Sequence, residues 1–345
     1  MTSRRLDPLG TRGLNRRQAL AATVAATAAA AGATVLAPAA HAAPQAFPDK
    51  ARTLQIIVPF AAGGGVDNAA RLLADQLRKR LGLNVLVDNR AGASGTLGGK
   101  FVQTAPADGY TLLFSAATHV HAQNVLKHPP YDPQTAFQPV ARVGEAPLLL
   151  VVAPNTERPT LTELLPRIRQ EPDRWTAAIP AAGAPSHLAT LLLEQKARLK
   201  LSYVPYKGTQ PALTDVAGGH VHLLMDSMIS LLPLAKAGKV KAVAISSKAR
   251  SGLAPDIPTV AEAGLPGFEY VSWYGVWAPQ ATPAPVVKAL NDAINASVAD
   301  LARSGQFSQL GISPVIDSPE AFRRFIAAEV GQGAALLKAA GFQPE

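Results

Sequence analysis

Cysteine is absent from this chain of 345 residues, and aromatic residues (6%) and charged residues (17%) are both few. Without cysteine there is no disulfide framework, no thiolate nucleophile and no thiolate ligand for a metal ion. The composition is typical of neither a disordered nor a coiled-coil chain. Hydrophobic residues make up 48% of the sequence, which is enough for two domains with cores of their own.

Residues 1–42 have the features of an export signal. Arg16 and Arg17 precede an alanine-rich, weakly apolar stretch, and Ala40-His41-Ala42 has the small-x-small pattern of a cleavage site. Adjacent arginines before a core of low hydrophobicity resemble a twin-arginine signal. An uncleaved membrane anchor is the alternative, and the small residues of the stretch argue against it. We predict export with cleavage near Ala42, and we find no later stretch that is long and apolar enough to span a bilayer.

The formal net charge of +9 is biased by the N-terminus, because residues 1–42 hold five arginines and one aspartate. The later lysines and arginines are scattered among acidic residues. Their densest run, RLLADQLRKRL, has the pattern of a solvated helix face rather than of a nucleic-acid patch. We therefore predict no nucleic-acid partner.

A strand–helix rhythm begins at Leu54. The apolar run Leu54–Val58 predicts a strand, Gly63-Gly64-Gly65 follows it, and a helical pattern covers residues 67–81. The same rhythm repeats from Leu148–Val152 onwards. Strands that alternate with helices predict a parallel sheet with right-handed crossovers, in which ligands bind at the carboxyl ends of the strands.

The repeated βα set predicts an α/β fold of two lobes. We expect residues 43–147 with 275–345 to form lobe 1 and residues 148–274 to form lobe 2, joined by two extended crossovers near 145–150 and 271–277. The two C-terminal helical patterns have no complete sheet of their own, so we expect them to cover lobe 1. Clefts between domains are preferred ligand sites, so we expect a ligand between the lobes.

The loops after the predicted strands carry small and hydroxylated residues. The glycine loop opens a helix, whose unpaired N–H groups and partial positive charge favour an anion. Comparable loops follow at Asn89–Gly95, Ser115–His119, Ala181–His187 and Tyr206–Thr209. Thr209 is expected to cap the helix that follows it. This pattern suits the binding of a carboxylate without turnover.

Motifs for catalysis are missing. The sequence has no G-x-S-x-G elbow, no H-E-x-x-H and no G-x-x-x-x-G-K-[ST], and its glycine loops lack dinucleotide spacing. The pairs His119/His121 and His220/His222 have no carboxylate at ligand spacing, so we predict no metal site. We predict no enzyme, no catalytic residue and no cofactor.

One catalytic alternative stays open, which is a secreted serine hydrolase. It would use Ser115 or Ser186 with a histidine, and a Ser115–His119–Asp226 triad can be drawn. Only the residue types support this triad.

Charged side chains are scarce in the loops, and each has two interpretations. Asp67 either braces the first helical turn or touches the ligand, and Lys207 either steers an anion or is solvated. Arg90 is expected to brace its own loop. Tyr206, Trp273 and Tyr274 either pack at the hinge or close over a ligand.

Several segments together resemble the Bug/TctC proteins, the extracytoplasmic solute receptors of tripartite tricarboxylate transporters. The segments are VPFAAGGGVDNAAR, VDNRAGASGTLGG, GAPSHLA and VPYKGTQPALTDVAGGHV. The resemblance covers essentially all of the chain after the predicted signal. It implies a type II periplasmic-binding-protein fold, with two α/β lobes that close on a carboxylate held mainly by main chain, small side chains and water. Val66 departs from the family pattern, since many members have Ser or Thr there.

The resemblance also implies a function and a set of ligand-binding residues. The function is that of a monomeric periplasmic receptor that captures a small organic carboxylate and delivers it to the membrane permease subunits of the transporter. A receptor of the same fold that signals to a sensor kinase is the alternative. The expected ligand-binding residues are Phe60, Ala61, Gly63, Gly64, Gly65, Asp67, Gly95, Ser115, Thr118, His119, Gly183, Ser186, His187, Tyr206 and Asp226.

Overall fold

The strand β4, Phe137–Val152, is 16 residues long and belongs to two sheets at once. Its first part pairs with β9 and its last part with β7 and β8. The computed structural model describes residues 47–157, 159–172 and 174–344, so the predicted export signal lies outside the described residues. Residues Phe47–Glu345 cluster as one unit.

Lobe 1 is built on the sheet that contains the first part of β4. In this sheet β1 lies between β2 and β3, parallel to both, and β9 pairs antiparallel with β3 and with β4. The short β10 pairs with β4 at the edge. Besides β4, its strands are β1 (Thr53–Val58), β2 (Asn84–Asn89), β3 (Thr111–Ser115), β9 (Val271–Pro279) and β10 (Ser313–Pro314).

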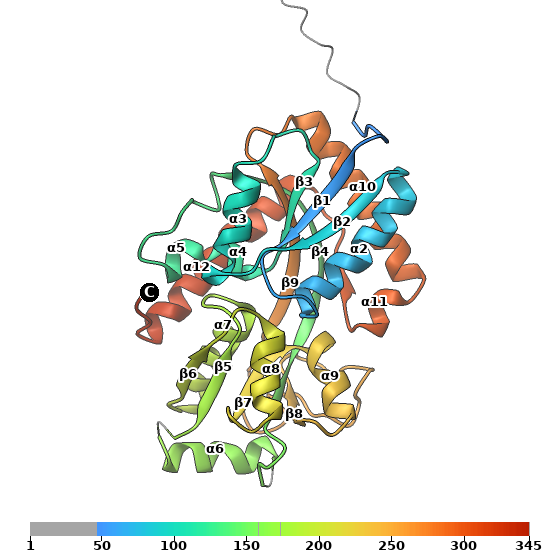
Figure 1. Ribbon diagram of the computed structural model, residues 1–345. Helices are drawn as coiled ribbons and strands as arrows, with labels where there is room; N and C mark the ends of the chain where they lie inside the picture. Colours follow the sequence, from blue (N-terminus) through green and yellow to red (C-terminus); the bar gives the residue numbers. More distant parts are fainter. Residues whose placement is uncertain (1–46, 158, 173, 345) are drawn as a thin grey trace, which may run out of the picture. The chain divides into compact units, whose positions relative to one another are not determined.

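Lobe 2 is built on the sheet that contains the last part of β4. Here β5 is parallel to β6 and β7, while β7 and β8 run antiparallel to β4. Figure 1 shows β4 and β9 passing between the two groups of elements. Its other strands are β5 (Thr176–Ile179), β6 (Ser202–Pro205), β7 (Leu223–Ser227) and β8 (Lys241–Ile245).

The helices cover the faces of these two sheets. In lobe 1 they are α2 (Gly65–Leu81), the 3-10 turn η1 (Ala93–Gly95), α3 (Thr96–Gln103), α4 (Ala117–Val120), α5 (Ala122–Val125), α10 (Ala284–Arg303), α11 (Gln306–Gln309) and α12 (Pro319–Ala339). In lobe 2 they are α6 (Leu161–Gln170), α7 (Pro185–Ala197), α8 (Thr209–Ala217) and α9 (Met228–Lys236). No helix among the described residues is long and apolar enough to cross a bilayer.

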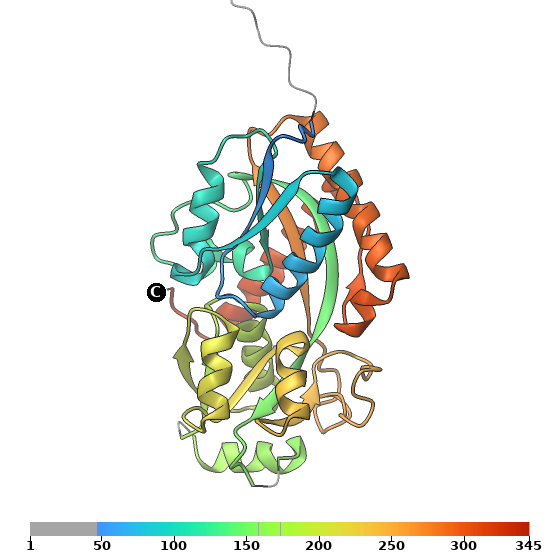
Figure 2. The same ribbon diagram turned by 45° about the vertical axis from the view of Figure 1, so that its right-hand side comes forward.

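The two C-terminal helices pack against elements of lobe 1. Leu290 of α10 shares a buried cluster with Leu73 of α2, and Figure 2 shows the two helices side by side. Phe322 of α12 packs on the aromatic strand β9, with its ring centroid 5.2 Å from that of Trp277. A smaller buried cluster links the lobes and consists of Val125, Leu188, Leu191 and Leu337.

The two-lobed α/β fold with two crossing strands is confirmed, and two details differ from the sequence-based expectation. The sheets are mixed rather than parallel, because β4, β8, β9 and β10 form antiparallel pairs. The strand predicted at Leu148–Val152 is only the end of β4. Its first part was missed because Pro139 and Gly144 interrupt the strand-like pattern, and the register indeed shifts between Pro139 and Ala141 and between Arg142 and Gly144.

The carboxyl ends of strands from both lobes meet at the junction of the lobes. Strands β1 and β3 lead to Phe60–Asp67 and to Ala116–Thr118, while β5, β6 and β7 lead to Pro180, to Gly208 and to Ser227. All of these segments contribute residues to one cavity. The fold thus assembles the site from loops that are far apart in the sequence.

Candidate functional site

The cavity between the lobes has about 460 Å³ of non-atom space, counting the open solvent at its mouth. Small side chains dominate the wall. The lining residues are Phe60, Gly64, Gly65, Val66, Asp67, Ala116, Thr118, Pro180, Ala181, Ala184, Pro185, Ser186, Gly208, Thr209, Asp226, Ser227, Ser272 and Tyr274.

Four helices of both lobes begin at the cavity wall: α2, α7, α8 and α9. In α2 the first intrahelical bond runs from the Asn68 amide to the Gly64 carbonyl, so the amides of Gly65 to Asp67 precede it. In α7 the first bond runs from Leu188 to Ala184. The amides that precede these bonds have no partner within their helix, and each helix start carries a partial positive charge. The arrangement is therefore suited to an anion.

Hydroxyl groups add to this anion-binding capacity. Thr118, Ser186, Ser227 and Ser272 line the cavity. The Oγ of Ser186 is buried and has no hydrogen-bond partner among the described residues. A buried polar atom without a partner is costly, so this hydroxyl is available to a ligand. No lysine, arginine or histidine stands among the described lining residues.

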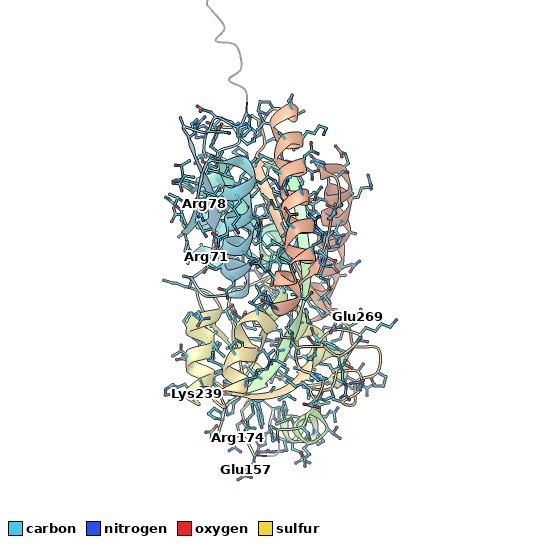
Figure 3. All side chains as sticks on the ribbon, turned by 90° about the vertical axis from the view of Figure 1, so that its right-hand side faces the viewer. Arg71, Arg78, Glu157, Arg174, Lys239 and Glu269 are labelled. Atoms are coloured by element: carbon cyan, nitrogen blue, oxygen red, sulfur yellow. The ribbon has the colours of Figure 1, made fainter. Side chains whose placement is uncertain are left out.

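Asp67 is one of two carboxylates in the wall, and its hydrogen bonds are taken up within lobe 1. Its Oδ2 accepts from the Gly63 amide (2.8 Å) and from Arg71 Nε (3.0 Å), and its Oδ1 accepts from Asn89 Nδ2 (2.9 Å). Burial by itself raises the pKa of Asp67, but the bonds from Arg71, Gly63 and Asn89 outweigh it and leave the pKa below the usual value. In Figure 3 Arg71 lies on α2 nearer to lobe 2 than Arg78 does. Asp67 therefore braces the glycine loop.

Asp226 is the other carboxylate, and its surroundings differ. Its Oδ2 accepts a hydrogen bond of 2.6 Å from Thr209 Oγ1, and the side chain is 8% exposed. Burial raises its pKa, against the lowering effect of the bonds from Thr209 and Ser227. Thr209 was expected to cap α8, and that expectation is wrong. The cap position belongs to Gly208, no side chain caps the helix, and the Thr209 hydroxyl binds Asp226 instead.

The two lobes touch each other directly around the cavity. The Gly63 carbonyl accepts from Gln210 Nε2 (2.7 Å) and from Ser230 Oγ (3.3 Å), both in lobe 2. A Cβ atom placed on Gly65 would lie 2.3 Å from Ser227 Oγ, which is closer than any allowed contact. The structure therefore shows the lobes closed on each other at the glycine loop.

The structure brings about half of the predicted ligand-binding residues together. Those in the cavity wall are Phe60, Gly64, Gly65, Asp67, Thr118, Ser186 and Asp226. Gly95 and Tyr206 line a smaller neighbouring pocket that shares Phe60 with the main cavity. Ala61 and Gly63 lie at the contact between the lobes, where the Ala61 amide donates to the Lys207 carbonyl at 3.4 Å.

The other predicted residues, Ser115, His119, Gly183 and His187, lie outside the cavity wall. His119 packs its ring against Phe137 and Trp277, with ring centroids 4.6 and 4.8 Å away, and burial lowers its pKa to about 3. His187 accepts from the Gly183 amide at 3.1 Å through Nδ1, and burial lowers its pKa to about 4. These two histidines therefore pack against residues next to the loops and do not line the cavity.

The hydrolase alternative finds no support in this geometry. The Oγ atoms of Ser115 and Ser186 have no hydrogen-bond partner among the described residues, so neither serine is paired with a histidine. The described part of the chain also contains no group of three or more metal-ligating side chains that could hold an ion.

Several wall residues were not among the expected ligand-binding residues, although Thr209 was named in a loop and Tyr274 as a residue that could close over a ligand. Thr209 and Ser227 follow predicted loop residues directly, so proximity along the chain was a usable signal. Ser272 and Tyr274 lie two apart on β9, and alternation along a strand places both on the face that lines the cavity. A serine within an aromatic strand was the available clue.

Two α/β lobes that share crossing strands and close on an anion-binding cavity define the class of bilobal solute-binding proteins. Comparison with known proteins assigns the family. The model of the tripartite tricarboxylate transporter family receptor, TctC, matches residues 69–342. The chain therefore belongs to the TctC family of periplasmic solute-binding receptors, which are not enzymes.

Individual relatives agree with this assignment. Protein BugT of Bordetella pertussis is 36% identical over 293 residues, which is 84% of this chain and 90% of that protein. The periplasmic binding protein BugD is 37% identical, with a TM-score of 0.80 over 85% of this chain and 99% of BugD. Rpa4515 of R. palustris, solved with adipate, is 33% identical, with a TM-score of 0.83 over 87% of this chain and 100% of Rpa4515. MatC of Rhodopseudomonas palustris, solved with malate, is 32% identical, with a TM-score of 0.77 over 83% of this chain and 99% of MatC.

Proposed function

We propose that this receptor captures a small organic carboxylate in the periplasm and delivers it to the membrane subunits of a tripartite tricarboxylate transporter. The observation that carries the proposal is the cavity itself, where four helices begin and no basic side chain lines the described wall. Such a site stabilises a carboxylate through backbone amides and hydroxyls. The adipate and malate bound by Rpa4515 and MatC support a ligand of this chemical class.

The predicted residues of the cavity wall are the ligand contacts that we propose. Gly65 and Val66 of lobe 1 and Ser186 of lobe 2 line the same cavity, so a carboxylate held by their amides and hydroxyl would join both lobes. A ligand that contacts both lobes favours the closed state, because only that state offers all of its contacts. The contacts from Gln210 and Ser230 to Gly63 would form at the same step.

Delivery to a transporter requires export and a partner. We propose that residues 1–42 direct export and that the mature receptor acts as a monomer on its permease. Loss of the ligand to the permease would accompany reopening of the lobes, because closure buries the cavity between them.

A thermal-shift screen of the chain from residue 43 onwards tests the binding step. A ligand that binds only the folded receptor stabilises it against unfolding, by about 2.7 kcal/mol when the ligand concentration is a hundred times Kd. The temperature of the unfolding midpoint rises accordingly. We expect stabilisation by at least one di- or tricarboxylate and none by the matching diamide. Failure of every carboxylate to stabilise the protein would refute the proposal. Uptake of the radiolabelled ligand by cells with and without the gene then tests the transport step.

A further inference from the structure

We propose that Asp226 selects, among carboxylates, those that carry a hydrogen-bond donor, a hydroxyl or an ammonium group, on the carbon chain next to a carboxylate. The inference rests on the proposed carboxylate-binding function and narrows the substrate class of the same cavity. It starts from the different situations of the two carboxyl groups in the cavity wall.

The two carboxyl groups differ in the partners they still need. Asp67 has a guanidinium, an amide and a side-chain amide as donors, all from lobe 1. Asp226 accepts from the Thr209 hydroxyl and from the Ser227 amide, and no basic side chain lines the described wall beside it. A carboxylate offers about four acceptor positions, so Asp226 can accept further hydrogen bonds from a ligand.

Because Asp226 is buried, its interactions with charged and hydrogen-bonding groups of a ligand are stronger than they would be in water. The Asp226 side chain is 8% exposed, and like charges repel far more strongly in a site of low polarity than in water. A ligand with only carboxylates would bring a second negative charge to Asp226. A ligand with a hydroxyl or an ammonium beside its carboxylate brings a donor, and hydrogen bonds to a charged acceptor are the stronger kind.

The position of Asp226 also fits a role in ligand choice. It stands at the end of β7, opposite Leu149 of the crossing strand β4, and it is followed by Ser227, the residue before α9. The start of α8, with Gly208 and Thr209, lies on the same wall. A ligand carboxylate at these helix starts therefore has its adjacent carbon close to the Asp226 carboxyl.

Matched ligands provide the test. Succinate, malate and aspartate share one carbon skeleton and differ in the hydrogen, hydroxyl or ammonium on one carbon. Glutarate, 2-hydroxyglutarate and glutamate form the corresponding series one carbon longer, and adipate, 2-hydroxyadipate and 2-aminoadipate the next. In titration calorimetry at neutral pH, we expect a substituted member to bind about tenfold to a hundredfold more tightly than its parent.

The variant Asp226→Asn keeps the volume of the side chain and removes its charge. We expect it to abolish the preference, because affinity for the substituted ligand falls while that for the parent diacid stays or rises. Thr118→Val, in the wall of lobe 1, is the control, since it should weaken both members of a pair alike. Unliganded unfolding midpoints of both variants report whether the fold is intact.

Three outcomes would each decide the matter. Tightest binding by an unsubstituted diacid, with proton uptake visible as buffer-dependent heats, would overturn the inference and leave the carboxylate receptor intact. Asp226 would then donate a proton, in a site whose other titratable wall residues are Asp67 and Tyr274. An unchanged preference in Asp226→Asn would also overturn it. Binding of no carboxylate at all would remove the proposed function together with this inference.

Discussion

Gln210 of lobe 2 donates a hydrogen bond of 2.7 Å from its Nε2 to the carbonyl of Gly63 in lobe 1. The same carbonyl accepts from Ser230 Oγ of lobe 2 and from Asn68 Nδ2 of α2 in lobe 1, both at 3.3 Å. Gly63 has a φ of +82°, a conformation that glycine adopts without strain. The glycine loop therefore serves as a contact between the two lobes.

Replacing Gln210 should loosen closure without touching the ligand, because Gln210 does not line the cavity. A net hydrogen bond is worth about 0.5–1.5 kcal/mol. We expect Gln210→Ala to accelerate amide hydrogen exchange in the loop 61–67 by about two- to thirteenfold. Gln134→Ala, on the surface of lobe 1, is the control and should leave that exchange unchanged. Equal protection in Gln210→Ala and the wild type would show that the bond does not hold the lobes together.

Gly65→Ala should hold the lobes apart. The added Cβ would lie 2.3 Å from Ser227 Oγ across the junction, and only 3.2 Å from Tyr274 Oη on β9. Overpacking of this kind costs about 1–3 kcal/mol, which corresponds to a loss of affinity of about five- to 150-fold. The measurement is the dissociation constant of the carboxylate that stabilises the wild type most in the thermal-shift screen. The free energy of unfolding of the unliganded variant should stay within about 1 kcal/mol of the wild-type value.

The clash at Gly65 also predicts a rescue. The double variant Gly65→Ala/Ser227→Gly removes the two atoms nearest to the new methyl, Oγ and Cβ of Ser227, so it should bind more tightly than Gly65→Ala alone. Ser227→Gly by itself gives the reference for the lost hydroxyl. Gly331→Ala, a helical glycine with nothing within 4 Å of its would-be Cβ, should change neither affinity nor closure. A double variant no better than Gly65→Ala would assign the defect to lobe 1 rather than to closure.

Asp67 should contribute to stability through its three hydrogen bonds. Asp67→Asn places an amide where the Gly63 amide and Arg71 donate, so we expect a loss of about 1–3 kcal/mol in the free energy of unfolding by urea. Because the pKa of Asp67 is lowered in the folded state, its contribution is present above about pH 3.9, the value in the unfolded chain, and is lost as the pH falls through the folded value. Asp75→Asn, which breaks an exposed ion pair with Arg78 on the same helix, should cost less than about 0.5 kcal/mol. Equal effects of the two substitutions would contradict this assignment.

His119 should make the fold sensitive to acid. Burial lowers its pKa to about 3, whereas in the unfolded chain it takes up a proton near pH 6.5. Between these values the unfolded state binds more protons, so stability falls as the pH falls. In His119→Phe this loss is absent. As the pH is lowered from 6.5 to 4, we expect the free energy of unfolding of the variant to rise relative to that of the wild type by up to about 1.4 kcal/mol per pH unit. Phe137→Leu, a neighbour without a titrating group, should show a difference that does not change with pH.

The local structure could be predicted closely from the sequence. The helix expected at 67–81 is Gly65–Leu81, and the strand expected at Leu54–Val58 is Thr53–Val58. Periodicity and glycine positions are local signals, so these elements required no knowledge of the fold. The roles of buried polar residues, in contrast, could be assigned only once the fold was known. His119 and His187 looked like ligand contacts in their loops, yet their rings pack behind the site.

The sequence by itself determined that strands end in short loops of small and hydroxylated residues, and that helices begin there. That was enough to indicate a carboxylate receptor, because a backbone site needs few charged side chains. Only the tertiary structure decided that Asp67 accepts three hydrogen bonds within lobe 1 while Asp226 accepts from Thr209 and Ser227, and that Gly63 meets Gln210, 147 positions away. Such pairs depend on which strand ends meet when two lobes close around β4 and β9, and no local pattern encodes contacts over that separation.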